Sequence, residues 1–115
     1  MKPSEQPLRV NLKELALKVL ATLQEKFPEA RLIPEDSLIP AIHAQIIHAY
    51  IYKLETEQQF SDYVVTAWLL GQDFDTEFPV VKEIMDSSDL TPAIKSKWLS
   101  RWTEETVLAF EKSEE

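Results

Sequence analysis

Apolar residues recur at helical spacing in the first third of the chain. From Leu12 to Phe27 they return three and four positions apart, while charged residues such as Lys13 and Glu25 fall outside this stripe or at its edge. This pattern predicts an amphipathic helix, with Asn11 as its N-cap and an end near Pro28. The expected inner stripe contains Leu12, Leu15, Ala16, Val19, Leu20, Leu23 and Phe27. Residues 1–10 contain two prolines and mixed charge, which is typical of a flexible arm.

A second helix is expected from about Leu38 to Leu54. It follows residues 28–37, which contain two prolines and resemble a connection. Isoleucine and tyrosine are only moderate helix formers, so packing rather than propensity would hold this helix. The residues expected on its inner half are Ile39, Ile42, Ile46, Ile47, Tyr50 and Leu54.

The most apolar part of the chain predicts a central helix from Glu57 to Leu70. Thr56 and Gln59 have the spacing of a capping box at its start. A helix that is apolar on nearly all sides is normally buried in the middle of a domain. Gly71, the single glycine of the chain, stands where a left-handed residue would end the helix. The apolar positions are Phe60, Tyr63, Val64, Val65, Ala67, Trp68, Leu69 and Leu70.

Two further helices complete the prediction. Pro79 should open a short one, Val80 to Asp86, and Thr91-Pro92 is a start signal for a last helix that reaches Lys112. The expected inward residues are Val81, Ile84 and Met85 on the short helix, and Ile94, Trp98, Leu99, Trp102, Ala109 and Phe110 on the last one. We therefore predict an all-α, single-domain bundle of about five helices over residues 11–112, with a frayed acidic tail at 113–115.

Composition narrows the function classes. One glycine in 115 residues makes phosphate-binding loops and tight hairpins improbable, and the absence of cysteine excludes disulfides, thiolate metal sites and cysteine nucleophiles. The first twelve residues lack the apolar run of a signal peptide, and no apolar stretch approaches the ~20 residues that span a bilayer. We expect a cytoplasmic protein without membrane insertion.

Charge is distributed unevenly along the chain. Residues 1–59 carry 7 basic and 8 acidic side chains, whereas residues 60–115 carry 5 basic and 12 acidic ones. An acidic surface repels phosphate backbones, so nucleic acid is not an expected partner. The same surface would attract a basic protein partner, although it would also serve solubility.

The acidic turn from Asp73 to Glu77 is the first candidate for chemistry. Its acids begin like a calcium-binding loop, but Phe78 and Ile84 occupy the positions that need glycine and glutamate. No basic residue or histidine lies nearby in sequence to support acid–base catalysis. The simpler interpretation is that Phe74 and Phe78 anchor the turn on the core while an acid caps the next helix.

The histidines and tryptophans are the remaining candidates. His43 and His48 lie five residues apart, so a helix points them in different directions and they cannot share a metal. His43 falls in the apolar stripe and is expected to be buried and hydrogen-bonded, whereas His48 should be solvated. Trp68, Trp98 and Trp102 are more often core residues than ligand contacts. We therefore predict no catalytic residues, no metal and no cofactor.

The second half of the chain resembles a known group of proteins. The residues that carry the resemblance are Thr56-Glu57, Phe60, Tyr63-Val64, Leu70-Gly71, Asp73-Phe74-Asp75, Pro79, Ile84-Met85, Leu90-Thr91-Pro92 and Trp98-Leu99. They resemble the small acidic helical accessory proteins encoded with type VI secretion effectors and other polymorphic toxins. The resemblance implies an adaptor, a chaperone or an immunity protein, and it supplies no catalytic residues.

These observations favour a non-enzymatic protein that binds a secreted effector or toxin. The expected partner-binding residues are acidic: Asp73, Asp75, Glu77, Asp86, Asp89, Glu104 and Glu105. The alternative is a small-ligand or regulatory domain whose aromatic pocket is lined by tryptophan, tyrosine and His43.

Overall fold

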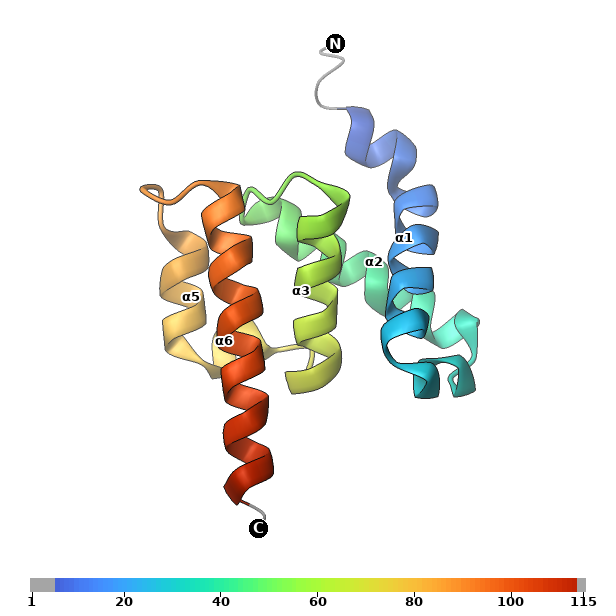
Figure 1. Ribbon diagram of the computed structural model, residues 1–115. Helices are drawn as coiled ribbons and strands as arrows, with labels where there is room; N and C mark the ends of the chain where they lie inside the picture. The colour runs from blue at the N-terminus through green and yellow to red at the C-terminus, as the bar shows by residue number, and fades with distance from the viewer. Residues whose placement is uncertain (1–5, 114–115) are drawn as a thin grey trace.

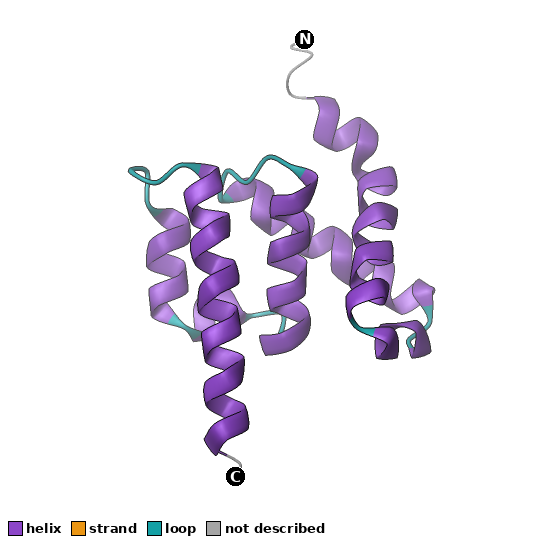
Figure 2. Ribbon diagram, in the orientation of Figure 1, coloured by secondary structure: helices purple, strands orange, loops and turns teal. Residues whose placement is uncertain are grey.

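The computed structural model describes the backbone of residues 6–113 and the side chains of residues 12–113. All regular structure in this range is helical, and it contains no strand (Figure 2). The elements in chain order are α1 (Gln6–Lys26), the 3₁₀ helix η2 (Pro28–Leu32), α2 (Glu35–Ile51), α3 (Glu57–Leu70), α4 (Phe74–Glu77), α5 (Pro79–Asp86) and α6 (Pro92–Ser113). The predicted all-α bundle is confirmed, and the single-turn α4 is an element that the sequence pattern did not predict.

Helix α3 is the centre of the molecule, as predicted. It packs against α1 and α2 on one side and against α6 on the other, and α5 contacts α4 and α6 (Figure 1). The C-terminal end of α6 runs past the end of α3 and projects from the bundle (Figure 1). Within the described residues, no helix combines the length and apolarity needed to cross a bilayer.

The ends of α3 are fixed by local hydrogen bonds. The Thr56 hydroxyl accepts from the Gln59 N–H at 3.1 Å, and the Gln59 side chain accepts from the Thr56 N–H at 3.2 Å. This confirms the predicted capping box. Gly71 ends the helix with φ 104° and ψ 155°. The positive φ agrees with the prediction, but the extended ψ does not, because the chain leaves the helix straight instead of making a left-handed turn.

Three predicted boundaries are wrong. Helix α1 begins at Gln6, so Asn11 lies inside it and residues 6–10 are not an arm; residues 1–5 lie outside the described part of the chain. Helix α2 begins at Glu35 and ends at Ile51, three residues early at each end. It contains the exposed Pro40 in its second turn, where proline has no backbone N–H to donate to the helix. Helix α6 ends at Ser113, within one residue of its predicted end near Lys112, and residues 114–115 lie outside the described part of the chain.

The core follows the predicted stripes of α1 and α5, and of α3 except for the exposed Leu69, and departs from two others. On α2, Ile47 and Tyr50 are exposed, whereas Gln45 and Ala49 face the core. On α6, Ile94, Ala109 and Phe110 are exposed, whereas Lys95, Ser96 and Thr103 are buried beside Leu99. The stripe prediction failed on α6 because its inward polar groups find partners on other helices, and because its projecting end has no helix to pack against.

Candidate functional site

The acidic turn after Gly71 is folded onto the core. Phe74 is fully buried, and its ring lies 4.8 Å from that of Tyr63. Phe78 packs edge-to-face on Trp102 with ring centroids 5.1 Å apart. The predicted aromatic anchoring is confirmed. The predicted acidic cap is wrong, because Phe78 is the N-cap of α5 and no side chain bonds to its first turn.

Asp75 is not on the surface. Only 7% of its area is exposed, and its Oδ2 accepts a 2.6 Å hydrogen bond from the Tyr52 hydroxyl. The expectation of an exposed carboxylate at this position is therefore wrong. The helical turn α4 points Asp75 inward together with Phe74, and burying a carboxylate requires a donor such as this phenol.

Two tyrosines surround this carboxylate. Burial, followed by the hydrogen bond and negative charge of Asp75, raises the pKa of Tyr52 well above its ordinary value. Burial and the Asp75 carboxylate likewise raise the pKa of Tyr63. The Tyr63 hydroxyl is buried near the carboxylate but makes no hydrogen bond of acceptable geometry. Both phenols therefore stay neutral at physiological pH and cannot act as bases.

Lys95 extends this buried polar cluster across three helices. Its side chain lies on α6, and its Nζ donates to the Met85 carbonyl at 2.6 Å and to the Tyr52 carbonyl at 3.1 Å. These carbonyls lie at the C-terminal ends of α5 and α2, where helices leave acceptors unpaired and where a cation is favoured. Burial lowers the pKa of Lys95. The cluster of Tyr52, Asp75, Tyr63 and Lys95 is buried, and its hydrogen bonds join α4, α5 and α6 to the C-terminal end of α2.

The other six predicted acids are exposed, but they do not form one patch. Asp73 precedes α4 and Glu77 is its last residue, whereas Asp86 and Asp89 lie at the opposite end of α5. An eight-residue helix separates the two pairs by about 12 Å. The acidic surface expected as a single feature is thus divided by α5.

Two of these six acids form ion pairs with basic residues, which reduces the negative charge available to a partner. Asp86 pairs with Lys82 at 2.9 Å, and Glu105 pairs with Arg101 at 3.6 Å. Both pairs are exposed and join residues four apart on one helix, so each contributes little stability. Of the predicted residues, Glu104 borders the concave surface between α3 and α6.

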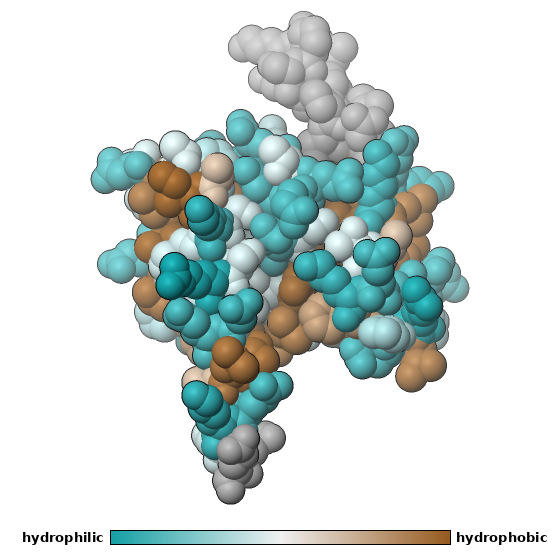
Figure 3. Space-filling view, in the orientation of Figure 1, coloured by the Kyte–Doolittle hydropathy of each residue, from teal (hydrophilic) through white to brown (hydrophobic). Residues whose placement is uncertain are grey.

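That concave surface is a groove of about 490 Å³ between α3 and α6, which the end of α1 closes at one side. Its floor is apolar, and Leu69 and Leu108 line it with 38% and 49% of their areas exposed. Figure 3 shows apolar surface where α6 leaves the bundle beside the lower end of α3. The apolar lining consists of Phe27, Val65, Leu69, Val107 and Leu108.

Acidic side chains border this groove. Asp62, Glu104 and Glu111 are among its lining residues, and Lys26 is the single basic one. Asp62 is held in place by the Ser96 hydroxyl at 2.7 Å and by the Gln58 amide at 2.9 Å. We call this feature the acid-rimmed groove. It can accept apolar side chains along its floor and cations along its edge.

Sequence reasoning found Glu104 but missed most of this groove. Asp62, Leu69, Leu108 and Glu111 were not predicted as partner-binding residues, although a signal existed. The α3 lining residues 62, 65, 66 and 69 and the α6 lining residues 100, 103, 104, 107, 108 and 111 each follow helical spacing. What the sequence could not reveal is that these two faces lie next to each other.

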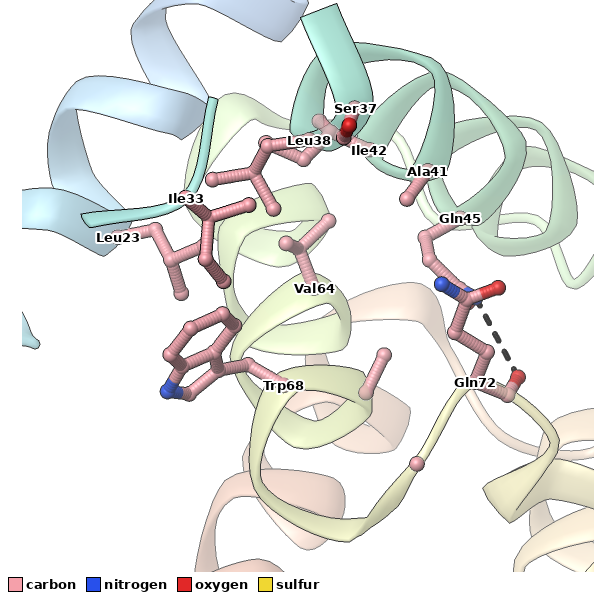
Figure 4. A pocket seen from close by; sticks show the side chains of 12 residues that line it. Leu23, Ile33, Ser37, Leu38, Ala41, Ile42, Gln45, Val64, Trp68 and Gln72 are labelled. Carbon is pink, nitrogen blue, oxygen red and sulfur yellow. Dashed lines mark hydrogen bonds between the residues drawn. The ribbon is translucent and has the colours of Figure 1, made fainter. Parts of the chain in front are cut away.

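A second recess lies between α1, α2 and α3. It has a volume of about 330 Å³, and Figure 4 shows Trp68 and Leu23 on one side of it and Gln45 and Gln72 on the other. The lining also includes Ile33, Ser37, Leu38, Ala41, Ile42, Val64, Ala67 and Gly71. We call it the α1–α3 pocket.

The α1–α3 pocket differs from the aromatic pocket of the alternative hypothesis, because its lining contains one tryptophan but no tyrosine and no histidine. Trp98 and Trp102 stack on each other at 5.7 Å and take no part in the α1–α3 pocket. His43 is half-buried and does not line this pocket. Its Nε2 makes no hydrogen bond, so the prediction of a buried, hydrogen-bonded histidine is wrong. His48 is exposed, as predicted.

Metal-binding residues do not gather anywhere in the described part of the chain: no three His, Asp or Glu side chains are placed to share an ion. Comparison with protein-family models, with curated proteins and with solved structures finds no match to this chain. The resemblance to effector accessory proteins therefore remains a prediction from the sequence.

Proposed function

We propose that this chain is a non-enzymatic protein-binding module that engages a secreted effector or toxin, as an adaptor, a chaperone or an immunity protein. The observation that carries the proposal is the acid-rimmed groove. It combines accessible leucines with three carboxylates in the half of the chain that holds 12 acidic and 5 basic residues. The resemblance in residues 50–102 supplies the class of partner.

The groove also indicates what the partner should carry. Two helices with a channel between them suit a third helix, whose apolar residues at positions i, i+3 or i+4, and i+7 would contact the floor. Cations beside these anchors would meet Asp62, Glu104 and Glu111. A partner helix with leucine-like anchors and flanking lysine or arginine fits this surface.

The proposal is tested by affinity purification from the source cells with wild-type protein and two variants. Leu108→Asp places a charge on the groove floor, and Leu32→Asp is its matched control, because Leu32 is 83% exposed on η2, away from the groove. We expect one stoichiometric partner with wild type and the control, and a loss of at least ~10-fold in affinity with Leu108→Asp. Equal capture by both variants would contradict binding at the groove.

Charge reversal tests the rim separately. Glu104→Lys combined with Glu111→Lys should weaken binding and remove part of its salt dependence, because rim charges mainly steer association. Glu29→Lys, on η2, is the control. No partner at low or moderate salt would count against the protein-binding proposal as a whole.

The two accessory roles are separated by a toxicity assay. If the protein confers immunity, co-expression should protect cells from the captured toxin, and the purified protein should inhibit the toxin's activity. If it is a chaperone or adaptor, the partner should become more soluble and remain active. A toxin that still kills when both are expressed excludes immunity.

A further inference from the structure

The α1–α3 pocket differs in chemistry from the rest of the surface. None of its twelve lining residues is ionisable, although charged residues make up 28% of the chain. Most of the lining is aliphatic, with Trp68 as its one aromatic side chain and Gln45 and Gln72 at the opposite side (Figure 4). Such a pocket disfavours charged molecules, because no counter-ion would replace their hydration.

Gln45 is the unusual residue of this pocket. It is 3% exposed, and its Nε2 donates to the Gln72 carbonyl at 3.3 Å. A carbonyl can only accept, so the amide nitrogen must face it and the amide oxygen must point elsewhere. That oxygen is buried and has no hydrogen-bond partner. An unpaired buried acceptor is costly, and it is a site that a donor would satisfy.

We propose that the α1–α3 pocket binds a small, neutral aromatic molecule with one N–H or O–H donor, which packs against Trp68 and donates to Gln45 Oε1. The exposed Gln72 side chain lies beside Gln45 and moves aside to admit the donor (Figure 4). A volume of about 330 Å³ is sufficient for a bicyclic aromatic, since benzene occupies engineered cavities of ~150 Å³. This inference is independent of the acid-rimmed groove and its partner.

The lining argues for a free small molecule rather than the side chain of a protein partner. Specific protein interfaces surround their apolar centre with polar and charged residues, as the acid-rimmed groove does. The lining of the α1–α3 pocket has no charged residue and ends in one amide pair. Recesses of this size and polarity fall at the lower end of the range for small-molecule sites.

The test compares two probes of nearly equal shape on the full chain. Indole has a ring N–H, whereas benzofuran replaces that group with an oxygen and cannot donate. Titrations followed by ¹H–¹⁵N NMR should move the resonances of Trp68, Leu38 and Ile42, with an indole Kd on the order of 0.1–1 mM. Benzofuran should bind about fivefold more weakly, because it leaves Gln45 Oε1 unpaired. Indole-3-carboxylate, which is charged, should not bind.

Substitutions test whether indole binds in this pocket. Gln45→Met keeps the side-chain length but removes the acceptor, so the affinity for indole should fall to that for benzofuran. Gln58→Met, which changes an exposed glutamine on α3, is the control. Ala41→Phe should fill the pocket and abolish binding, whereas Ala44→Phe, one turn away and exposed, should not. If indole up to its solubility limit leaves Trp68 unmoved, or if wild type binds indole and benzofuran equally, the proposal is overturned without reference to any variant.

Discussion

A buried carboxylate needs hydrogen-bond donors, and Asp75 obtains one from a tyrosine 23 residues earlier in the chain. Nothing local to the acidic turn signals this contact. Asp73 and Glu77, its neighbours on either side, are exposed. The sequence pattern does not distinguish the three acids, whereas in the folded protein the turn α4 directs only Asp75 toward the core. Residue-scale roles in this protein therefore depend on contacts between helices.

The Tyr52–Asp75 pair should contribute to stability. Tyr52→Phe removes the donor and leaves the carboxylate buried, so we expect a loss of ~1.5–3 kcal/mol in the free energy of unfolding. Tyr50→Phe, two residues away and exposed, should change it by less than ~0.5 kcal/mol. Urea denaturation of both variants measures the difference, and equal midpoints would show that the hydrogen bond is not formed in solution.

The raised tyrosine pKa values predict how stability changes at alkaline pH. The unfolded phenols ionise near pH ~10, while folded Tyr52 and Tyr63 remain protonated, so the folded state binds more protons and stability falls as pH rises above ~10. Lys95 has the opposite effect, because its pKa is lowered in the folded state. Between its folded and unfolded pKa values, the unfolded state binds more protons, so Lys95 alone would make stability rise with pH. Two phenols acting against one ammonium should leave a net loss of stability.

An absorbance titration tests this prediction directly. The Tyr50→Phe variant retains Tyr52 and Tyr63 as its only phenols. We expect no tyrosinate absorbance near pH 10, and then an increase that coincides with the loss of helical circular dichroism. Reversible ionisation of the folded variant near pH 10 would contradict the buried environment of both hydroxyls.

At the scale of elements, locally encoded features were predicted and non-local ones were not. Helix α3 was predicted with its observed limits, because its capping box and Gly71 are signals within the helix itself. The inner face of α6 was not, because Ser96 and Thr103 are satisfied by Asp62 and Thr66 on α3. A polar residue looks exposed in the sequence when its partner lies 34 or 37 positions away.

The conformation of Gly71 predicts an unusual substitution pattern. Its φ of 104° with ψ 155° belongs to a region that is almost exclusive to glycine, and an added Cβ would meet no closer atom than Glu77 Oε1 at 3.7 Å. Gly71→Ala should therefore destabilise by ~1–3 kcal/mol through backbone strain alone. Gly71→Asn should give no recovery, because asparagine favours the left-handed helical region and not this one. Thermal denaturation checks both, and a nearly neutral Gly71→Asn would mean that the helix ends in a left-handed turn after all.

The whole molecule is a thin slab of 55 × 38 × 19 Å. Such a shape leaves many large apolar side chains on the surface, including Leu69 and Leu108 at the acid-rimmed groove. The all-α class and the central place of α3 could be inferred from periodicity, whereas the single-turn α4 could not. The groove could not, because it exists only where the end of α1 and the faces of α3 and α6 meet.

The projecting end of α6 should serve binding more than folding. All side chains from residue 108 to residue 113 are exposed. Deleting residues 108–115 should therefore change the free energy of unfolding by less than ~1 kcal/mol. The same deletion removes Leu108 and Glu111 from the groove and should weaken partner capture to the level of Leu108→Asp. Circular dichroism measures the unfolding of the truncated protein, and affinity purification measures its binding of the partner. A large loss of stability would mean that this end of α6 supports the core.

Lys95 has a consequence for the order in which the chain folds. Its two hydrogen bonds join residue 95 to residues 85 and 52, so they can form only after α2, α5 and α6 have come together. We expect these contacts to be absent from the folding transition state, and contacts absent from that state affect the unfolding rate rather than the folding rate. Lys95→Met should thus raise the unfolding rate several-fold and leave the refolding rate nearly unchanged, whereas Lys97→Met, exposed on the same helix, should alter neither. Stopped-flow chevron plots would show whether the hydrogen bonds of Lys95 form after the folding transition state, once the helices are already packed together.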